Sequence, residues 1–166
     1  MRYCIQPATT NDVAFLAMAI DPGATDWSEG DEEPTNRLLR TCASSSQVWA
    51  IRDRNNVPQA LWGVSPRPDD AEVGCMWLIA CEQLEETPED FRALSGMVLG
   101  EMFAQFSRLE NFVDADRERA LDLLRIVGFQ VGPAITSSGS DKSWHRVWID
   151  ADGAGSSMAE RPHYLN

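Results

Sequence analysis

The longest apolar stretch of the chain runs from Val73 to Cys81 and contains no charged residue. Its length and composition are typical of a strand that is buried on both faces, with Trp77 as a large core residue. The segment Thr87-Pro88 then provides a helix cap and a proline suited to the first helical position. Apolar residues follow at intervals of three and four, namely Phe91, Leu94, Val98, Met102 and Phe106. This pattern predicts a central strand followed by a long helix with one apolar face.

A second helix and further strands are predicted after this pair. The apolar pattern indicates a strand over Leu109–Val113, a helix over Arg117–Val127 and a strand that begins at Gly128-Phe129. Strand, helix and strand in this order predict at least one parallel crossover. In the last predicted strand, Ser143–Ile149, alternate residues fall on opposite faces, and His145 reads as a strand-face side chain because no catalytic partner for it is evident.

The part of the chain before the central strand is predicted to contribute two helices and three strands. Two of these strands flank a turn at Arg54-Asn55-Asn56 and should form an antiparallel hairpin. Pro66–Asp70 is predicted to be a stiff polar loop that leads into the central strand. The remaining predicted elements are a strand over Arg2–Gln6, a helix that starts near Thr9–Asp12, a helix over Pro34–Ala43, and the hairpin strands Val48–Arg52 and Pro58–Val64. The chain therefore predicts a three-stranded antiparallel meander before the crossover.

Length and composition indicate one globular domain. The chain has 166 residues, of which 43% are apolar, and this is enough for one substantial core. Periodicity is lost after Ala151. Residues 1–150 are therefore predicted to form the domain, and residues 151–166 a tail that is flexible or becomes ordered on a partner.

The formal net charge of −12 argues against binding to nucleic acid or to an anionic membrane. No signal peptide is recognisable, and no apolar run approaches the roughly 20 residues of a membrane span. Cys4, Cys42, Cys75 and Cys81 show no framework spacing and are expected to be buried free thiols in a reducing cytoplasm. With only two histidines in the chain, a histidine-rich metal site is excluded, and no metal site is predicted.

Two local motifs support a family resemblance. The segment Ile5–Thr9 followed by Asp12 resembles the opening strand and first helix cap of GNAT-type N-acetyltransferases, and the spacing of Ala120, Leu124 and Gly128-Phe129 resembles their last helix and the strand after it. The order of elements over residues 2–150 is similar to the same fold. The resemblance implies an α/β (α+β) protein with a GNAT-like mixed sheet of six or seven strands, an antiparallel meander before a parallel crossover, and three or four flanking helices.

The expected cofactor loop departs from the family pattern. Members of the family bind the coenzyme A pyrophosphate through a glycine-rich turn after the fourth strand, where backbone amides cradle the phosphates. The corresponding positions here contain neither glycine nor a basic residue: Glu82, Gln83, Leu84, Glu85, Glu86 and Thr87. Pro88 lacks an amide N–H, and the nearby carboxylates repel phosphate. These residues are therefore interpreted as a vestigial loop, with no bound cofactor expected unless the protein is an active, acetyl-CoA-dependent member.

The resemblance also indicates that the usual catalytic residues are absent. Arg117 stands where the family commonly has asparagine, and Leu124 stands where it commonly has the tyrosine that acts as general acid. Leucine has no proton to donate. No catalytic residue is predicted; Glu72 is a weak candidate base at the start of the central strand, and a solvated strand-end carboxylate is the better explanation of this residue.

A narrower resemblance concerns the small internal virion protein of short-tailed bacteriophages. The series Trp77–Leu84, Phe91-Arg92, Phe112-Val113 and Leu123–Gly128 is similar to that family. It implies a catalytically degenerate GNAT-fold phage protein that acts as a virion or assembly component, located in the virion or the host cytoplasm. Its partners would be other phage or virion proteins, and its oligomeric state stays open.

Three residues are candidates for binding such partners: Trp27, His163 and Tyr164. For Trp27, packing back onto the core is an equally good interpretation. Two other functions remain open. The first alternative is an acetyl-CoA-dependent N-acetyltransferase with a divergent cofactor loop, and the second is an acidic, host-directed regulatory binding protein.

Overall fold

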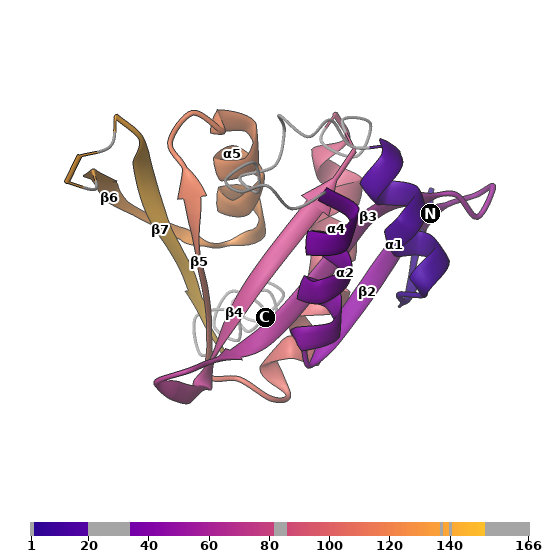
Figure 1. The fold of residues 1–166 in the computed structure, drawn as a ribbon, viewed down its shortest axis with the longest axis horizontal. Coiled ribbons are helices and arrows are strands. Elements are labelled where there is room, and N and C mark those ends of the chain that lie inside the picture. Colours follow the sequence, from indigo (N-terminus) through magenta and orange to yellow (C-terminus); the bar gives the residue numbers. More distant parts are fainter. Residues whose placement is uncertain (1, 20–33, 82–85, 137, 140, 152–166) are drawn as a thin grey trace, which may run out of the picture. The chain divides into compact units, whose positions relative to one another are not determined.

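The computed structural model describes residues 2–19, 34–81, 86–136, 138–139 and 141–151. Its strands form a seven-stranded sheet in the order β1-β2-β3-β4-β5-β7-β6 (Figure 1). Along the chain the elements are β1 (Tyr3–Pro7), α1 (Thr10–Ala19), α2 (Pro34–Ser44), β2 (Gln47–Asp53), β3 (Pro58–Arg67), β4 (Asp70–Ala80), α4 (Pro88–Phe103), β5 (Arg108–Asp114), α5 (Glu118–Val127), β6 (Gln130–Thr136) and β7 (Ser143–Asp150). The predicted mixed sheet with an antiparallel meander and a parallel crossover is confirmed.

The chain divides into two compact units, Met1–Ser65 with Met76–Val98, and Pro66–Cys75 with Leu99–Asn166. The boundary passes through β4, whose first residues belong to the second unit and whose later residues belong to the first. Each unit has its own buried residues, and each is described separately below.

In the first unit, the two faces of β3 contact different helices. Leu61 belongs to an apolar cluster with Val13 and Leu16 of α1 and with Leu38 of α2. The next residue, Trp62, stacks on Phe91 of α4, with ring centroids 5.7 Å apart. Because neighbouring residues of a strand point to opposite faces, α1 and α2 pack on one side of this part of the sheet and α4 on the other.

In the second unit, β7 pairs antiparallel with both β5 and β6. The sheet residues Leu109, Val147 and Ile149 are buried, as are Leu121 and Leu124 of α5. Gly128 ends α5 in the left-handed conformation, with φ 115°, and its N–H bonds to the carbonyls of Arg125 and Leu124. The predicted helix and the glycine that follows it are therefore confirmed.

Three predicted strands extend further in the structure than the sequence indicated. β3 continues through Pro66 to Arg67, and β4 begins at Asp70, so the predicted loop over Pro66–Asp70 was wrong. β6 continues through Pro133, next to a register shift between Val131 and Ala134. Proline has no N–H, but it is accepted at bulges, on edge strands and at positions that do not donate to a neighbouring strand.

The cysteines are free thiols, but their burial differs from the prediction. Cys4 is exposed, and Cys42, Cys75 and Cys81 are half-buried. Cys4 lies on β1, which is an edge strand of the sheet, and strand alternation directs its side chain away from the buried Tyr3. Within the described ranges, no helix is long and apolar enough to cross a membrane.

Candidate functional site

The predicted cofactor loop lies after the carboxyl end of β4. Glu82, Gln83, Leu84 and Glu85 lie outside the described residues. Glu86 is exposed and Thr87 is half-buried, and the carbonyl of Thr87 accepts a hydrogen bond from the N–H of Phe91 at 3.1 Å. α4 starts at Pro88 as predicted. Its first position therefore offers no amide N–H to a ligand.

The backbone pairing between β4 and β5 is short. It joins Val73–Cys75 to Arg108–Glu110 in parallel. β4 continues to Ala80, and no backbone pairing with β5 is found for its described residues 76–80. At the end of β4, the N–H of Cys81 donates to the carbonyl of Gln59 at 2.9 Å. The later half of β4 thus pairs with β3.

Arg117 and Leu124, which stand where the family commonly has asparagine and the tyrosine general acid, lie at the start of α5 and within it. Leu124 is 4% exposed and belongs to the buried side of the helix, with Leu121 and Leu123. Arg117 directly precedes the helix. An aliphatic, buried side chain at position 124 offers no proton to a leaving group. The residue that would supply general acid catalysis by the family's usual route is absent from this position.

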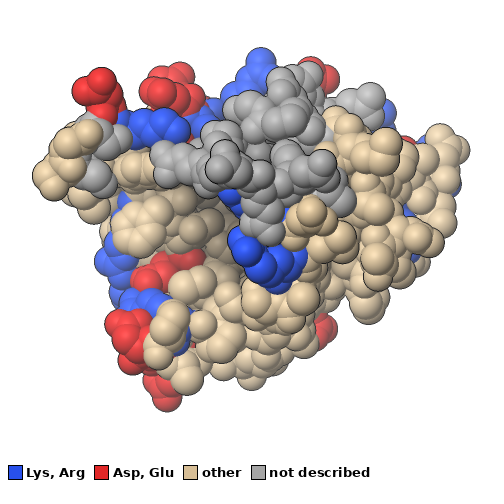
Figure 2. All heavy atoms as spheres, in the orientation of Figure 1, with Lys and Arg blue, Asp and Glu red and all other residues tan. Residues whose placement is uncertain are grey.

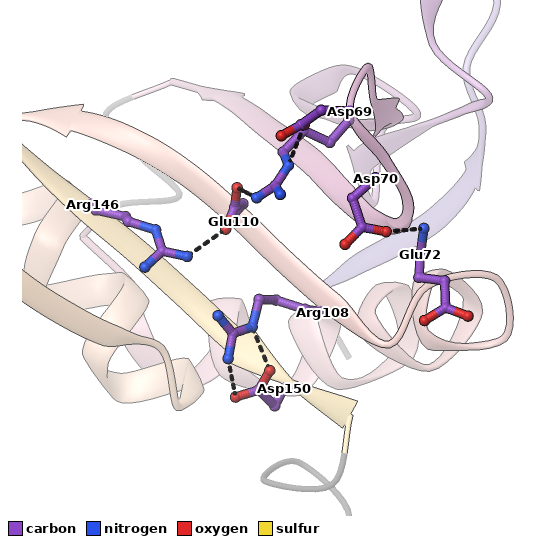
Figure 3. A network of polar contacts seen from close by, with 8 residues as sticks. Asp69, Asp70, Glu72, Arg108, Glu110, Arg146 and Asp150 are labelled. Carbon is purple, nitrogen blue, oxygen red and sulfur yellow. Dashed lines mark hydrogen bonds and ion pairs between the residues drawn. The ribbon is translucent and has the colours of Figure 1, made fainter.

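Glu72, the weak candidate base, is exposed near the start of β4 (Figure 3). Its backbone N–H donates to Asp70 Oδ1 at 3.0 Å, and its carbonyl accepts from the N–H of Ser107 at 2.8 Å. Residues 82–87 follow the opposite, carboxyl end of the same strand. The role of Glu72 as a base stays a prediction, and its place at the amino end of β4 does not favour it.

A cluster of ion pairs in the second unit was missed by the sequence analysis. Glu110 on β5 is 6% exposed. Its Oε1 accepts from Arg67 Nη1 at 2.7 Å, and its Oε2 accepts from Arg146 Nη2 at 2.8 Å. Arg108 forms a bidentate pair with Asp150, at 2.6 and 3.1 Å (Figure 3). One buried carboxylate therefore holds two guanidinium groups, with a second ion pair on the same two strands.

The cluster extends to the turn between β3 and β4. Arg67 Nε donates to Asp69 Oδ1 at 2.6 Å, and the side chain of Asp69 is 74% exposed. Figure 2 shows basic and acidic groups side by side at the lower left of the face in view, where Figure 1 places this turn. The guanidinium of Arg146 also lies over the ring of Trp148, 5.1 Å from its centroid. Such contacts restrict the orientation of the guanidinium groups.

The environment of Glu110 lowers the pKa of its carboxyl group. Burial alone raises this pKa, but the hydrogen bonds from Arg146 and Arg67 outweigh burial and bring it below its ordinary value of 4.5. A carboxylate whose pKa is lowered by folding stabilises the folded state above its unfolded pKa, and this contribution is lost as the pH falls through the folded pKa. The direction of this pKa shift therefore predicts that the folded state loses stability in acid.

We expect the free energy of unfolding to fall as the pH drops below 4.5, in part because Glu110 takes up a proton and loses its two charged partners. Chemical denaturation at a series of pH values measures this. Glu110→Gln has no charge to lose at this position, so its stability should depend less steeply on pH in the same range. Parallel pH profiles for the two proteins would contradict this role of Glu110.

A hollow of about 810 Å³ adjoins this cluster. Among its lining residues are Arg67, Asp70, Ser107, Arg108, Arg146 and Asp150. It lies at the amino ends of β4 and β5, and all of its lining residues belong to the second unit. Its volume lies within the range of small-molecule sites.

The predicted partner-binding residues Trp27, His163 and Tyr164 lie outside the described residues, so this role stays a prediction. Among the residues that the structure describes, no group of three or more metal-binding side chains is found. His145 is half-buried in β7, and its Nδ1 lies 2.8 Å from the carbonyl oxygen of Gly132. The ring nitrogen can donate to this carbonyl, which gives His145 a structural partner.

Comparison with known proteins identifies the fold. The chain matches no protein-family model and no curated protein sequence. Among solved structures it is similar to the spermidine N-acetyltransferase from Vibrio cholerae in complex with CoA and spermine, with TM-score 0.71 and 12% identity over 92% of this chain and 98% of that chain. It is also similar to an acetyltransferase of the GNAT family from Streptococcus pneumoniae, with TM-score 0.64 and 13% identity over 89% and 98% of the chains. The protein therefore has the GNAT acetyltransferase fold.

Proposed function

We propose that the protein is an acetyl-CoA-dependent N-acetyltransferase with a divergent cofactor loop. The observation that supports this most is the match of fold along nearly the whole chain to an acetyltransferase whose solved structure contains CoA. A chain that had kept only part of the fold would lack elements of the sheet, yet all seven strands are present in a continuous order. The proposal favours an enzyme over a degenerate virion protein.

The edge of β4 beyond Cys75 is the part of the described chain best suited to an extended ligand. Its described residues 76–80 make no backbone ladder with β5, so their N–H and C=O groups on that edge can pair with the amides of a pantetheine arm. An extended ligand that pairs with a strand edge gains main-chain hydrogen bonds without requiring particular side chains. This mode of binding is compatible with the low sequence identity to the structural neighbours.

The phosphates of the cofactor would lie in a less favourable environment. The start of α4 lacks an N–H at Pro88, and the N–H of Phe91 is already bonded to Thr87. Glu89 and Asp90 bring negative charge to the first turn. We therefore expect weak binding that tightens as salt is added, because salt screens the repulsion between the phosphates and these carboxylates.

The acceptor is proposed to be a cationic amine. The net charge of −12 raises the local concentration of cations and opposes anionic acceptors. Spermidine and spermine are the first amines to test, since a structural neighbour is a spermidine N-acetyltransferase in complex with spermine. An unprotonated amine nitrogen of the acceptor would attack the thioester carbonyl and give up its proton to solvent, the C–S bond would break, and the departing thiolate would take a proton from solvent. Without a general acid at Leu124, turnover should be slow.

Acetyl-CoA is expected to raise the thermal stability of the protein. Ligand at about 100 times its dissociation constant stabilises a folded protein by about 2.7 kcal/mol. Thermal unfolding measured against acetyl-CoA concentration tests binding, and release of the CoA thiol on addition of spermidine tests catalysis. Glu89→Gln should tighten binding because it removes a repelling charge from the first turn of α4, which begins at Pro88.

Glu101→Gln is the matched control, because Glu101 is an exposed glutamate near the far end of the same helix. It should leave acetyl-CoA binding unchanged. No stabilisation by acetyl-CoA at about 5 mM, where even a millimolar ligand would be largely bound, would refute the proposal.

A second candidate function is a catalytically silent GNAT-fold protein that acts through protein contacts, as a virion or assembly component. The burial of Leu124 at the position of the usual general acid favours it, and so does the acidic composition after β4. A folded protein that fails to bind acetyl-CoA would favour this second function. Its phage partners remain a proposal based on the sequence resemblance.

A further inference from the structure

The hollow at the amino ends of β4 and β5 is lined by several basic side chains, which is unusual for so acidic a protein. Three arginines line it: Arg67, Arg108 and Arg146. They come from the end of β3, from β5 and from β7. Two carboxylates, Asp70 and Asp150, also line it. If Glu110 and Asp69 are counted with them, four carboxylates face three arginines, so the local charge does not favour an anion. Any selectivity for a ligand must therefore come from hydrogen-bond donors rather than from net charge.

The donors on these walls outnumber the acceptors that they bond. Each guanidinium carries five N–H groups. Within the described residues, Arg146 uses one of them, on Glu110. Arg67 uses two, on Asp69 and Glu110, and Arg108 uses two, on Asp150. Both oxygens of Glu110 and both oxygens of Asp150 are already occupied by these bonds. Counted over the described residues, the hollow therefore presents arginine N–H groups that no acceptor bonds, while its carboxylate oxygens are largely satisfied.

The arginines are also held in place before any ligand arrives. Glu110 is 6% exposed and accepts hydrogen bonds from both Arg67 and Arg146. The guanidinium of Arg146 is also held over the ring of Trp148. Arg108 and Asp150 are directly opposite each other in the β5–β7 ladder. Donors that are fixed in advance lose less conformational entropy on binding, which is a property of binding sites.

We propose that this hollow binds a small molecule through an oxyanion group, either a phosphate or a carboxylate. Planar guanidinium groups match both kinds of oxyanion and bond them bidentately. The site lies at the amino ends of β4 and β5, whereas the cofactor proposed above would lie along the later half of β4. The proposal does not depend on acetyltransferase activity, and the two can fail separately.

The test is a backbone amide NMR titration of the full chain with sodium phosphate and, separately, with sodium succinate, each against sodium chloride at the same ionic strength. Saturable shifts are expected at Ser107 and Gln130, which line the hollow. Arg108→Gln should weaken binding roughly tenfold, as the loss of charged hydrogen bonds implies. Asp69→Asn should tighten it roughly threefold, because it removes an exposed negative charge from Arg67.

Arg125→Gln is the matched control, because Arg125 is an exposed arginine on α5 that pairs with Asp122 and does not line the hollow. It changes the net charge by the same amount as Arg108→Gln but should not alter the titration. If Arg108→Gln does not fold, Asp69→Asn still tests the proposal, because Asp69 is a largely exposed turn residue and its substitution should leave the protein folded. Saturation by phosphate alone assigns a phosphate group, and saturation by succinate alone assigns a carboxylate. No saturation by about 50 mM of either ion, or equal effects of Arg125→Gln and Arg108→Gln, would overturn the proposal.

Discussion

Replacement of Arg52 by methionine is expected to lower the free energy of unfolding by about 3–5 kcal/mol. Arg52 on β2 and Asp12 on α1 are 8% and 4% exposed. Arg52 Nε donates to Asp12 Oδ1 at 3.0 Å, Nη2 donates to Asp12 Oδ2 at 2.5 Å, and Nη1 donates to Gln6 Oε1. The single substitution leaves the carboxylate of Asp12 buried without its counterion, which costs more than the pair itself contributes.

Urea denaturation of Arg52→Met, of a control variant and of a double variant shows how much of the lost stability comes from the unpaired charge on Asp12. Arg54→Met is the matched control, because Arg54 is exposed in the turn after β2, and its change should stay within about 0.5 kcal/mol. The double variant Asp12→Asn with Arg52→Met removes the stranded charge, while the amide oxygen of the introduced asparagine still accepts the N–H of Thr9, so it should recover part of the loss. A loss below about 1 kcal/mol for Arg52→Met would show that the pair is not a buried ion pair of the usual strength.

This pair also illustrates what a sequence can and cannot reveal. The cap formed by Thr9 and Asp12 was predicted, and it is present: the N–H of Thr9 donates to Asp12 Oδ2 at 2.8 Å. The partner Arg52 lies 40 positions further along the chain. Local spacing identifies a cap because the cap is local, whereas the choice of a partner from a distant strand depends on the tertiary fold.

The ion pairs around Glu110 were missed for a related reason. Arg108, Glu110 and Phe112 alternate along β5, and Arg146, Trp148 and Asp150 alternate along β7. Strand periodicity alone places each set on one face. The register that brings Arg108 opposite Asp150 depends on how β5 and β7 pair, and neither strand's own sequence specifies that pairing. The alternation of charged residues within an apolar strand was the available signal.

The order of elements along the chain and the crossover were predictable because apolar periodicity and helix caps are local signals. The ends of β3 and β6 were less predictable. Pro66 was assigned to a loop, but in the structure it lies inside β3, and Pro133 lies inside β6. The absent glycine after β4 is a matter of sequence alone, and it continues to argue for weak cofactor binding even though the fold is that of the acetyltransferases.

Tryptophan residues show the same limit of pattern analysis. The central apolar run favoured Trp77 as the large core residue, but Trp77 is half-buried, lies close against Gly63 and donates its Nε1–H to Ser45 Oγ at 3.0 Å. Trp62, in the preceding strand, is fully buried and stacks on Phe91. Period-two alternation assigns a residue to a face but does not say how completely a helix covers that face.

Trp62→Ala is therefore expected to lower the free energy of unfolding by about 3–5 kcal/mol, as for other large buried residues. The substitution removes the stack between Trp62 and Phe91 and leaves a cavity between β3 and α4. Thermal or urea denaturation with circular dichroism measures the loss. Trp77→Ala should cost less, about 2 kcal/mol, because part of the Trp77 side chain already contacts solvent.

Trp62→Phe is the informative second variant. The indole N–H of Trp62 is buried without a hydrogen-bond partner among the described residues, so its removal relieves an unsatisfied donor while the ring keeps its stack on Phe91. The relief and the smaller cavity oppose each other, and we expect a net loss of about 1 kcal/mol or less. If Trp62→Phe cost as much as Trp62→Ala, the stabilisation would come from the full indole volume rather than from the stacked ring, and the packing of α4 on this face of β3 would need to be redrawn.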